Sequence, residues 1–337
     1  MYPSSCGLPG ALTSATQTAR LRTGIRLALR CALCTLALWV SCVSGEAAGR
    51  NTGEPEIDTE HLFGFLAGTD VGQAGEKEIE SETTGHFGKG AGSYDALLHR
   101  LALELMPLPN FRLELGAANS YHNISGLAQL NDQWQGTDLN DQQQGPFLHD
   151  QKQGAFQGLL VDARYRLLDR KSAPFGLTLE AQSQWARIDE LTGERVDQYG
   201  LDVSVLMDKE LVRDRIVGVF NLFYEPQSTR VHATGDWQRE ALFGVGTGVM
   251  AQVWPRVLVG AEARYLRHYD SLGLEEFGGQ AFFLGPTIYA KFGDRNRWRV
   301  TAAWSMQVVG RSAAAGGSLD LINFPHHEGR LRIGFEF

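Results

Sequence analysis

Cysteine is scarce in this chain of 337 residues, and its four copies lie near the start. They are Cys6, Cys31, Cys34 and Cys42, so the chain from residue 43 onward contains none. Disulfide bonds, thiolate metal sites and a cysteine nucleophile are therefore excluded from that part of the chain. Its stability has to come from another source.

Long apolar runs and basic clusters are also missing. No stretch of about 18 or more apolar residues occurs, and helical membrane proteins need such stretches. The formal net charge is -8, and beyond the N-terminus no cluster of lysine and arginine forms a surface for phosphate. We therefore expect no nucleic-acid partner.

Residues 1–49 have the order of a secretory signal peptide. Arginines precede a short apolar run, CALCTLALWVSCV, and small residues follow it in SGEAAG. A run of about thirteen residues is short for a bilayer span and suits the apolar part of a signal peptide. We predict that residues 1–49 are removed, with a plain N-terminal membrane anchor or a lipoprotein attached through Cys42 as the alternatives.

Residues 50–75 form a polar stretch with a single apolar patch, HLFGFL, at residues 61–66. We expect this stretch to be a periplasmic or plug segment. If it folded into a barrel it would close the lumen. It could instead add one more strand, which would upset an even strand count.

From residue 76 to the end, apolar and polar residues alternate with period two, which is typical of strands that have one apolar and one polar face. FRLELGA at residues 111–117 and FGLTLEA at residues 175–181 are clear examples. About twelve strands are predicted: 76–87, 93–105, 111–123, 155–167, 175–188, 196–208, 214–225, 237–250, 256–269, 280–292, 297–310 and 328–337.

Short and long connections alternate between these segments. Tight links such as residues 106–110 and 293–296 take turns with longer links rich in Gly, Asn, Gln and His, such as residues 124–154 and 311–327. Outer-membrane barrels require this sorting, since their periplasmic turns are short and their outer loops longer. The predicted fold is all-β: a transmembrane antiparallel up-and-down β-barrel over residues 76–337.

The polar faces of the predicted strands carry many charges. In a dry core each unpaired charge would cost several kcal/mol, whereas in a wet lumen it costs little. We therefore place the charged rows inside and the apolar rows toward lipid. The residues expected to line the lumen and set its selectivity are Glu78, Glu80, Arg100, Arg112, Arg164, Glu180, Asp202, Glu262, Arg264 and Arg299.

The chain ends on RLRIGFEF, a further alternating segment with an aromatic last residue. With the signal sequence, the twelve segments and the opening GEKEIE, this end resembles bacterial outer-membrane β-barrels of the porin-like transporter kind, over residues 60–337. The resemblance implies the outer membrane of a Gram-negative cell, contact with its lipid, and recognition by the barrel-assembly machinery. The assembly signal would comprise Arg330, Leu331, Ile333, Phe335 and Phe337. It departs from the usual pattern, since Arg332 stands where glycine is expected and the glycine is at position 334.

Three functions follow as hypotheses. The first is a channel or transporter through which small hydrophilic solutes diffuse past charged side chains. The second is a structural or surface-interaction barrel whose lumen is closed by salt bridges. The third, an outer-membrane lipid enzyme using His122 and Ser125, has no acid or amide to complete its catalytic set, so we expect no enzyme. No cofactor or metal is expected either, because the adjacent His326 and His327 would point to opposite faces of a strand.

Overall fold

A computed structural model describes residues 57–90, 92–126 and 150–337 of the chain. The predicted signal peptide lies outside the described residues. Twelve strands make up the fold: β1 (Lys77–Phe87), β2 (Ser93–Leu108), β3 (Phe111–Ser125), β4 (Gln151–Leu168), β5 (Gly176–Ile188), β6 (Arg195–Val212), β7 (Ile216–Val231), β8 (Trp237–Trp254), β9 (Val257–Tyr269), β10 (Phe277–Phe292), β11 (Trp298–Ser312) and β12 (His327–Glu336).

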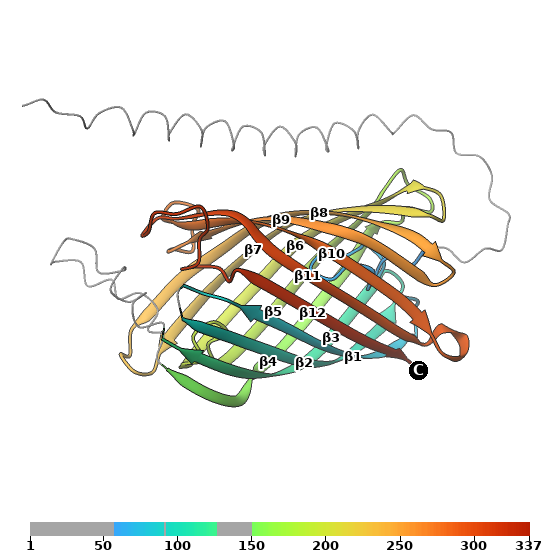
Figure 1. Ribbon diagram of the computed structural model, residues 1–337. Helices are drawn as coiled ribbons and strands as arrows, with labels where there is room; N and C mark the ends of the chain where they lie inside the picture. Colours follow the sequence, from blue (N-terminus) through green and yellow to red (C-terminus); the bar gives the residue numbers. More distant parts are fainter. Residues whose placement is uncertain (1–56, 91, 127–149) are drawn as a thin grey trace, which may run out of the picture. The chain divides into compact units, whose positions relative to one another are not determined.

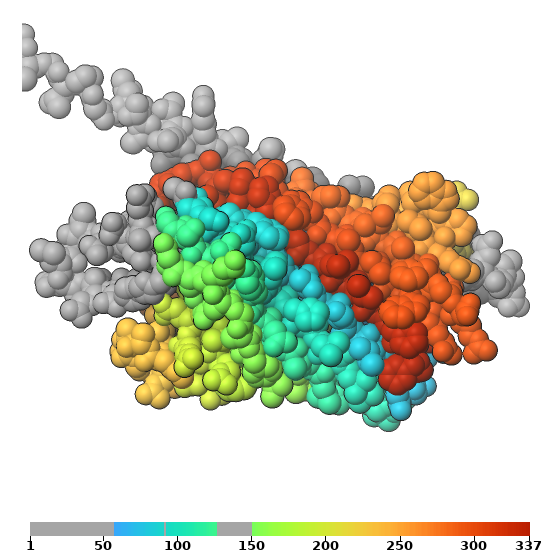
Figure 2. Space-filling view, turned by 60° about the horizontal axis from the view of Figure 1, so that its bottom comes forward, coloured from blue at the N-terminus to red at the C-terminus, as the bar shows by residue number. Residues whose placement is uncertain are grey.

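The strands form one closed antiparallel barrel in which each pairs with its neighbours along the chain (Figure 1). The last strand closes it by pairing with the first, from Glu78 opposite Glu336 to Phe87 opposite His327. Figure 2 shows this seam on the outer surface, where blue β1 lies against red β12. The predicted fold class is confirmed. Closure leaves no unpaired edge to lipid, as a bilayer requires.

The two longest connections lie at the same end of the barrel. At the end that holds Phe337 the links are short, and Asn110, Asp214 and Arg256 adopt positive φ in three of them. The other end carries the longer links, residues 126–150 and 313–326 among them. By the rule for outer-membrane barrels, the short links mark the periplasmic end and the long links the outer end.

Several strands reach further toward the outer end than their sequence patterns indicate. β7 continues to Val231, so most of residues 225–236, expected to be a long loop, is strand, and β4 begins at Gln151 instead of residue 155. Above the bilayer the outer face of a strand no longer meets lipid, so apolar and polar residues no longer need to alternate there. The expected loop boundaries at these two places were therefore wrong.

Side chains on the outer surface are apolar, as in a barrel surrounded by lipid. Large apolar residues remain widely exposed in mid-strand, including Leu101, Leu159 and Leu201. Inward-facing positions on the same strands carry buried charges such as Glu104 and Asp162. Among the described residues, none of the helices is long and apolar enough to cross a membrane.

Candidate functional site in the barrel lumen

Residues 57–76, here called the plug loop, lie inside the periplasmic half of the lumen. The loop enters at the periplasmic mouth, turns near Phe65, and returns to the same mouth to begin β1. Its two limbs touch, because the Thr59 amide donates to Asp70 Oδ2 at 2.9 Å. A Cβ on Gly68 would lie 2.3 Å from Thr59 Cβ, so only glycine fits where the limbs cross. The apolar patch at residues 61–66 is a turn within the plug loop and not an extra strand.

One side of the lumen receives the apolar side chains of the plug loop. Leu62 and Phe63 are fully buried and Leu66 nearly so. We call this side the apolar wall; with Ile57, the residues that pack there are Val217 and Val219 of β7, Met250 of β8, Leu258 of β9 and Tyr289 of β10. Fully burying a Leu or Phe side chain is worth about 1.5 to 3 kcal/mol, so this contact stabilises the inserted loop substantially.

Glycines on the inner face of β8 make room for these side chains. Built on Gly246, a Cβ would lie 2.2 Å from a methyl carbon of Leu66, and one on Gly248 would lie 2.9 Å from the ring of Phe63. The sequence GVGTG on β8 therefore places bare backbone where the plug loop packs. Without side chains there, the loop approaches the strand closely.

At its turn the plug loop binds a carboxylate of the wall. The backbone amides of Gly64, Phe65 and Leu66 all donate to Glu262 on β9, each at 2.8 Å. The Thr287 hydroxyl donates to the same carboxylate. Hydrogen bonds to an ionised acceptor are roughly twice as strong as neutral ones. Glu262, expected to face a water-filled pore, instead holds the tip of the plug loop.

Two further wall side chains satisfy the backbone of the returning limb. Asn221 on β7 accepts from the Ala67 amide at 2.8 Å and donates to the Ala67 carbonyl at 2.9 Å. Fully buried Asp208 on β6 accepts from the Thr69 amide at 2.9 Å and from the Thr59 hydroxyl at 2.6 Å. Arg170 pairs with Asp208 at 3.2 Å. Side chains of the wall thus bind the returning limb as far as Thr69, and only its last residues, Gly75 and Glu76, exchange backbone hydrogen bonds with Met106 of β2.

The opposite side, formed by β11, β12 and β1 to β5, is a charged wall centred on Arg112. This buried guanidinium contacts four carboxylates, at 3.2 Å from Glu60, 2.9 Å from Glu104, and 3.2 Å from both Glu114 and Asp162. Glu60 belongs to the plug loop and the other three to β2, β3 and β4. The planar fork of arginine suits several carboxylates at once.

Ion pairs extend from this centre around the charged wall. Arg100 contacts Glu82 at 3.4 Å and Glu80 and Glu114 at 3.8 Å. Arg332 pairs with Glu82, and Arg299 with Glu78. On the other flank Arg164 lies 2.6 Å from Glu180. Together these pairs form a salt-bridged layer from β11 across the seam to β5.

Above the plug loop, loops from the outer end fold into the mouth. Phe324 of the link between β11 and β12 packs on Phe283, Leu266 and Ala281. The link between β5 and β6 contacts the opposite rim, where the Tyr94 hydroxyl donates to the Leu191 carbonyl at 2.9 Å. The periplasmic and outer ends of the lumen therefore both contain folded chain.

Lys89, in the link between β1 and β2, is buried among these outer loops. Burial lowers the pKa of Lys89 to about 8, against the attraction of Asp189 and Asp320. Burial also raises the pKa of Asp320, while the amide of Asn323 opposes the shift. The outer mouth is thus desolvated enough to change the titration of its charged groups.

Comparison with known proteins places the chain in a family. The model of the Family of unknown function (DUF6662) matches residues 55–337, which include the plug loop and all twelve strands. The chain belongs to this family. The matched region starts two residues before the plug loop. No curated protein sequence matches the chain significantly.

Among solved structures, the chain is similar to the COG4313 outer membrane channel from Pseudomonas putida F1, with 11% identity and a TM-score of 0.52 over 86% of this chain and all of that one. The translocator domain of the autotransporter NalP from Neisseria meningitidis gives 12% identity and a TM-score of 0.45, over 80% of this chain and 91% of that domain. The first likeness shows a shared fold. With the apolar outer surface, that fold places this member of the DUF6662 family in the bacterial outer membrane.

All ten residues expected to line the lumen have inward-facing side chains in this family member, though few of them face open space. Glu262 binds the plug loop. Arg112, Arg164, Arg299, Glu78, Glu80, Arg100 and Glu180 belong to the salt-bridged layer. Arg264 pairs with Glu328 and lies over the rings of Phe65 and Phe283, and Asp202 accepts from Gln182 at 2.8 Å. Their role in selectivity stays a prediction.

Other residues at this site have no evident sequence signal. Asp208 and Asn221 lie on polar rows like many others, and nothing in their spacing distinguishes them as plug-binding residues. The repeated glycines of β8 were the one available sign, because inward-facing glycines at every second position leave a groove.

Gly334, the displaced glycine near the C-terminus, has a local explanation. A Cβ at this position would lie 1.9 Å from Glu78 Oε1, so the glycine leaves room for the carboxylate of the paired strand. Arg332, at the usual glycine position, pairs with Glu82. Leu331 and Ile333 face outward, as expected of the closing strand. The charged wall thus explains both departures from the usual pattern, because Gly334 leaves room for Glu78 and Arg332 pairs with Glu82.

His122, proposed as a catalytic base, faces the lumen and is partnered there. Its Nε2 lies 2.8 Å from the carbonyl oxygen of Glu190 in an outer loop. Ser125, the proposed partner, is exposed at the end of β3. In this geometry His122 therefore binds the link between β5 and β6.

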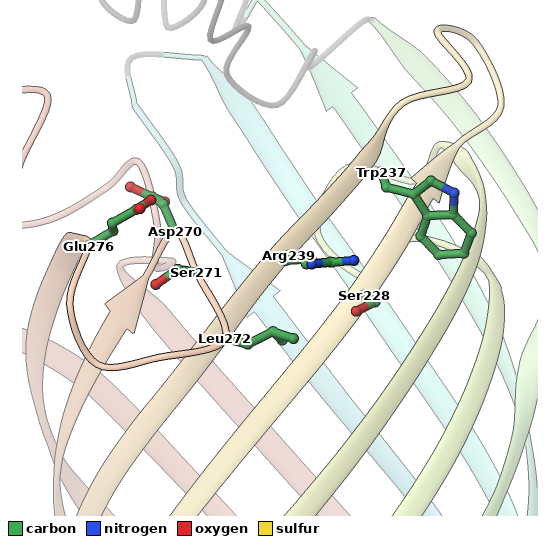
Figure 3. A pocket seen from close by; sticks show the side chains of 7 residues that line it. All are labelled: Ser228, Trp237, Arg239, Asp270, Ser271, Leu272 and Glu276. Carbon is green, nitrogen blue, oxygen red and sulfur yellow. The ribbon is translucent and has the colours of Figure 1, made fainter.

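A surface pocket of about 760 Å³ lies at the outer rim of the barrel (Figure 3). Ser228, Trp237 and Arg239 line it from β7 and β8, and Asp270, Ser271, Leu272 and Glu276 line it from the link between β9 and β10. The Tyr224 hydroxyl on β7 donates to the Leu272 carbonyl and fixes this link against the barrel. The pocket is separate from the plug loop.

Proposed function

We propose that the protein is an outer-membrane channel for small hydrophilic solutes that its plug loop keeps closed at rest. One observation carries this proposal: the plug loop is bound in the lumen by side chains, as a ligand would be, with both ends at one mouth. Withdrawal of residues 57–72 would leave the strand pairing of the barrel intact. The wall left behind would carry carboxylates and guanidiniums suited to a water-filled passage.

Selectivity in the open state would come from the charged wall. Arg100, Arg112 and Arg299 would line the passage together with their paired carboxylates of β1 to β4. A mixed-charge lining of this kind favours polar over apolar solutes and responds to ionic strength.

Conductance in planar bilayers tests the proposal. We expect the full chain to give rare openings and a variant lacking residues 57–72 to give frequent, stable conductance steps. Absence of steps from both proteins would overturn the channel function.

A cross-link supplies the matched control. Cysteines introduced at Ala67 and Asn221, which share two hydrogen bonds, would join the plug loop to β7 in a chain otherwise free of cysteine after residue 42. We expect conductance to be absent when the pair is oxidised and to return on reduction. Equal conductance in both states would contradict a role for the plug loop as the gate.

A structural or surface-interaction barrel with a permanently closed lumen is the second candidate. The salt-bridged layer around Arg112 favours it, since that layer would stabilise a filled barrel as well as line a passage. A folded plug-deleted variant without conductance would support this candidate.

A lipid enzyme receives little support, because His122 is engaged by a loop carbonyl. Hydrolysis of phospholipid vesicles by the wild type and its loss in His122→Ala would reverse this view.

Assembly through the C-terminal strand is also part of the proposal. Arg330, Leu331, Ile333, Phe335 and Phe337 would present the signal to the barrel-assembly machinery. We expect deletion of Phe337 to lower the amount of protein in the outer membrane several-fold, as measured by immunoblot of membrane fractions. Deletion of the exposed loop residue Gly316 serves as the control, and normal levels of the Phe337 deletion would show that the signal lies elsewhere.

A further inference from the structure

A cluster at the junction of the plug loop and the charged wall contains more carboxylates than its cations can pair with. His61 and Glu60 of the plug loop meet Glu78 of β1 and Glu104 of β2, and all four are almost completely buried. His61 Nε2 lies 3.3 Å from Glu78 Oε2, 3.8 Å from Glu104 Oε2 and 4.0 Å from Glu60 Oε2. One ring nitrogen therefore faces three carboxylate oxygens.

Neither this nitrogen nor the facing oxygen of Glu60 has a hydrogen-bond partner. A proton on His61 Nε2 could be donated well to only one of the three oxygens. The ion pairs of Glu60 and Glu104 are with His61 and Arg112, and Arg112 is shared with Glu114 and Asp162. Buried polar atoms without partners are rare and call for an explanation.

The second ring nitrogen is arranged as in a metal site. His61 Nδ1 lies 3.1 Å from Glu80 Oε2, which can accept its proton and leave Nε2 as a free lone pair. Histidines that bind metals usually donate the other N–H to a carboxylate in this way, which fixes the tautomer and the ring orientation. Arg112 and Arg299 hold the carboxylates of Glu104 and Glu78 in place through the same Oε2 atoms that face His61 Nε2.

We infer that Glu60, His61 and Glu104, with Glu78 as a fourth ligand, form a binding site for a divalent transition-metal cation of the Zn²⁺ type. Zn²⁺ binds imidazole nitrogens and carboxylate oxygens at about 2.0 to 2.2 Å, most often in tetrahedral geometry. Donors of a tetrahedral site with such bonds lie roughly 3.4 Å apart. His61 Nε2 is already 3.3 Å from Glu78 Oε2, whereas the ligand atoms of Glu60, His61 and Glu104 lie within 4.8 Å of one another and would have to approach by up to about 1.4 Å. The nitrogen ligand disfavours Ca²⁺ and Mg²⁺, which prefer oxygen.

Two ligands come from the plug loop and two from the barrel, so the cation would join them. This inference stands apart from the proposed channel function, because a plug could be fastened in a barrel that never conducts.

Zn²⁺ binding to the purified full-length protein, refolded in detergent after treatment with a chelator, tests the site. We expect about one Zn²⁺ per chain by elemental analysis after dialysis and at least a tenfold weaker affinity for His61→Gln by calorimetry. Ca²⁺ should give no comparable binding. Absence of bound Zn²⁺ in the wild type, or unchanged affinity in His61→Gln, would overturn the inference.

The surface pair His326 and His327, whose rings lie 4.1 Å apart, is the obvious competing site. A variant with both residues changed to Gln should keep the bound Zn²⁺. Loss of the metal from this variant alone would assign the binding to the surface and contradict the buried site.

Cobalt spectroscopy on the wild type covers the case in which His61→Gln does not fold. Co²⁺ in a four-coordinate site of nitrogen and oxygen absorbs far more strongly in the visible than six-coordinate Co²⁺. An intense visible band that Zn²⁺ abolishes is the expected result. A weak six-coordinate spectrum would refute the site.

Discussion

The two sides of the lumen hold the plug loop by opposite physical means. The apolar wall of β7 to β10 buries Leu62, Phe63 and Leu66, and each contact is favourable without a partner of defined charge. The charged wall surrounds Glu60 and His61 with ionised groups that are costly to bury and are stabilised only by their mutual geometry. The apolar wall therefore supplies affinity, while the charged wall fixes the position of the loop and responds sharply to changes in charge.

The largest effect is expected from Arg112→Met, which leaves four carboxylates without their shared guanidinium. Breaking a buried ion pair from one side costs about 3 to 5 kcal/mol. We expect a loss of this size in the free energy of unfolding, measured by urea titration in lipid vesicles. Arg213→Met, at an exposed periplasmic turn, should change it by less than about 0.5 kcal/mol. A loss below about 1 kcal/mol for Arg112→Met would show that the charged wall tolerates excess negative charge.

Glu262→Ala should release the tip of the plug loop. Three backbone amides would lose a charged acceptor, and a hydrogen bond to a charged group contributes about 1.5 to 3 kcal/mol. We expect a cysteine placed at Phe65 to react with a water-soluble maleimide at least tenfold faster in this variant. Glu275→Ala in an exposed outer loop is the matched control, and equal rates in the two variants would argue against Glu262 as the anchor.

Gly246→Val tests the apolar wall by adding a side chain where Leu66 packs. Overpacking costs about 1 to 3 kcal/mol, so the inserted state of the loop should be destabilised by that amount. The same cysteine-reactivity measurement reports it. Val249→Leu lies on the lipid face of the same strand and should leave the rate unchanged. If Gly246→Val behaves like this control, the close packing of plug loop and β8 is wrong.

Thr301→Val is expected to have the smallest effect. Its hydroxyl donates to the carbonyl of His61, and the net contribution of such a hydrogen bond is about 1 kcal/mol. Cysteine reactivity at Phe65 should rise by less than tenfold. A rise as large as that of Glu262→Ala would mean that the charged wall holds the loop through a few neutral bonds, contrary to the comparison drawn above.

Most of the barrel could be predicted from the sequence because lipid on one side and charge on the other impose strict alternation, as in residues 111–117. The strand ends beyond the bilayer could not, since around Pro226 the outer face no longer meets lipid and the alternation disappears. The inward direction of Glu262 and Arg112 follows from the same alternation, but their partners do not.

The conformation and position of the plug loop could not be predicted from hydrophobic periodicity. Residues 57–76 follow neither a helical nor a strand repeat, and their contacts with Asp208 and Asn221 join positions more than a hundred residues apart. The sequence predicted a plug as one of several possible structures for the apolar patch at residues 61–66. Which wall would receive it depended on the glycines of β8, whose meaning emerges only once the barrel is closed.

Because the plug loop continues directly into β1, it is an intramolecular ligand on a short tether. A tether of a few residues gives a bound group an effective concentration on the order of millimolar. Closure would therefore be independent of the amount of protein in the membrane and would need no second molecule. Whatever displaces the plug loop must compete with that local concentration, and once it lets go, the barrel would close again unaided.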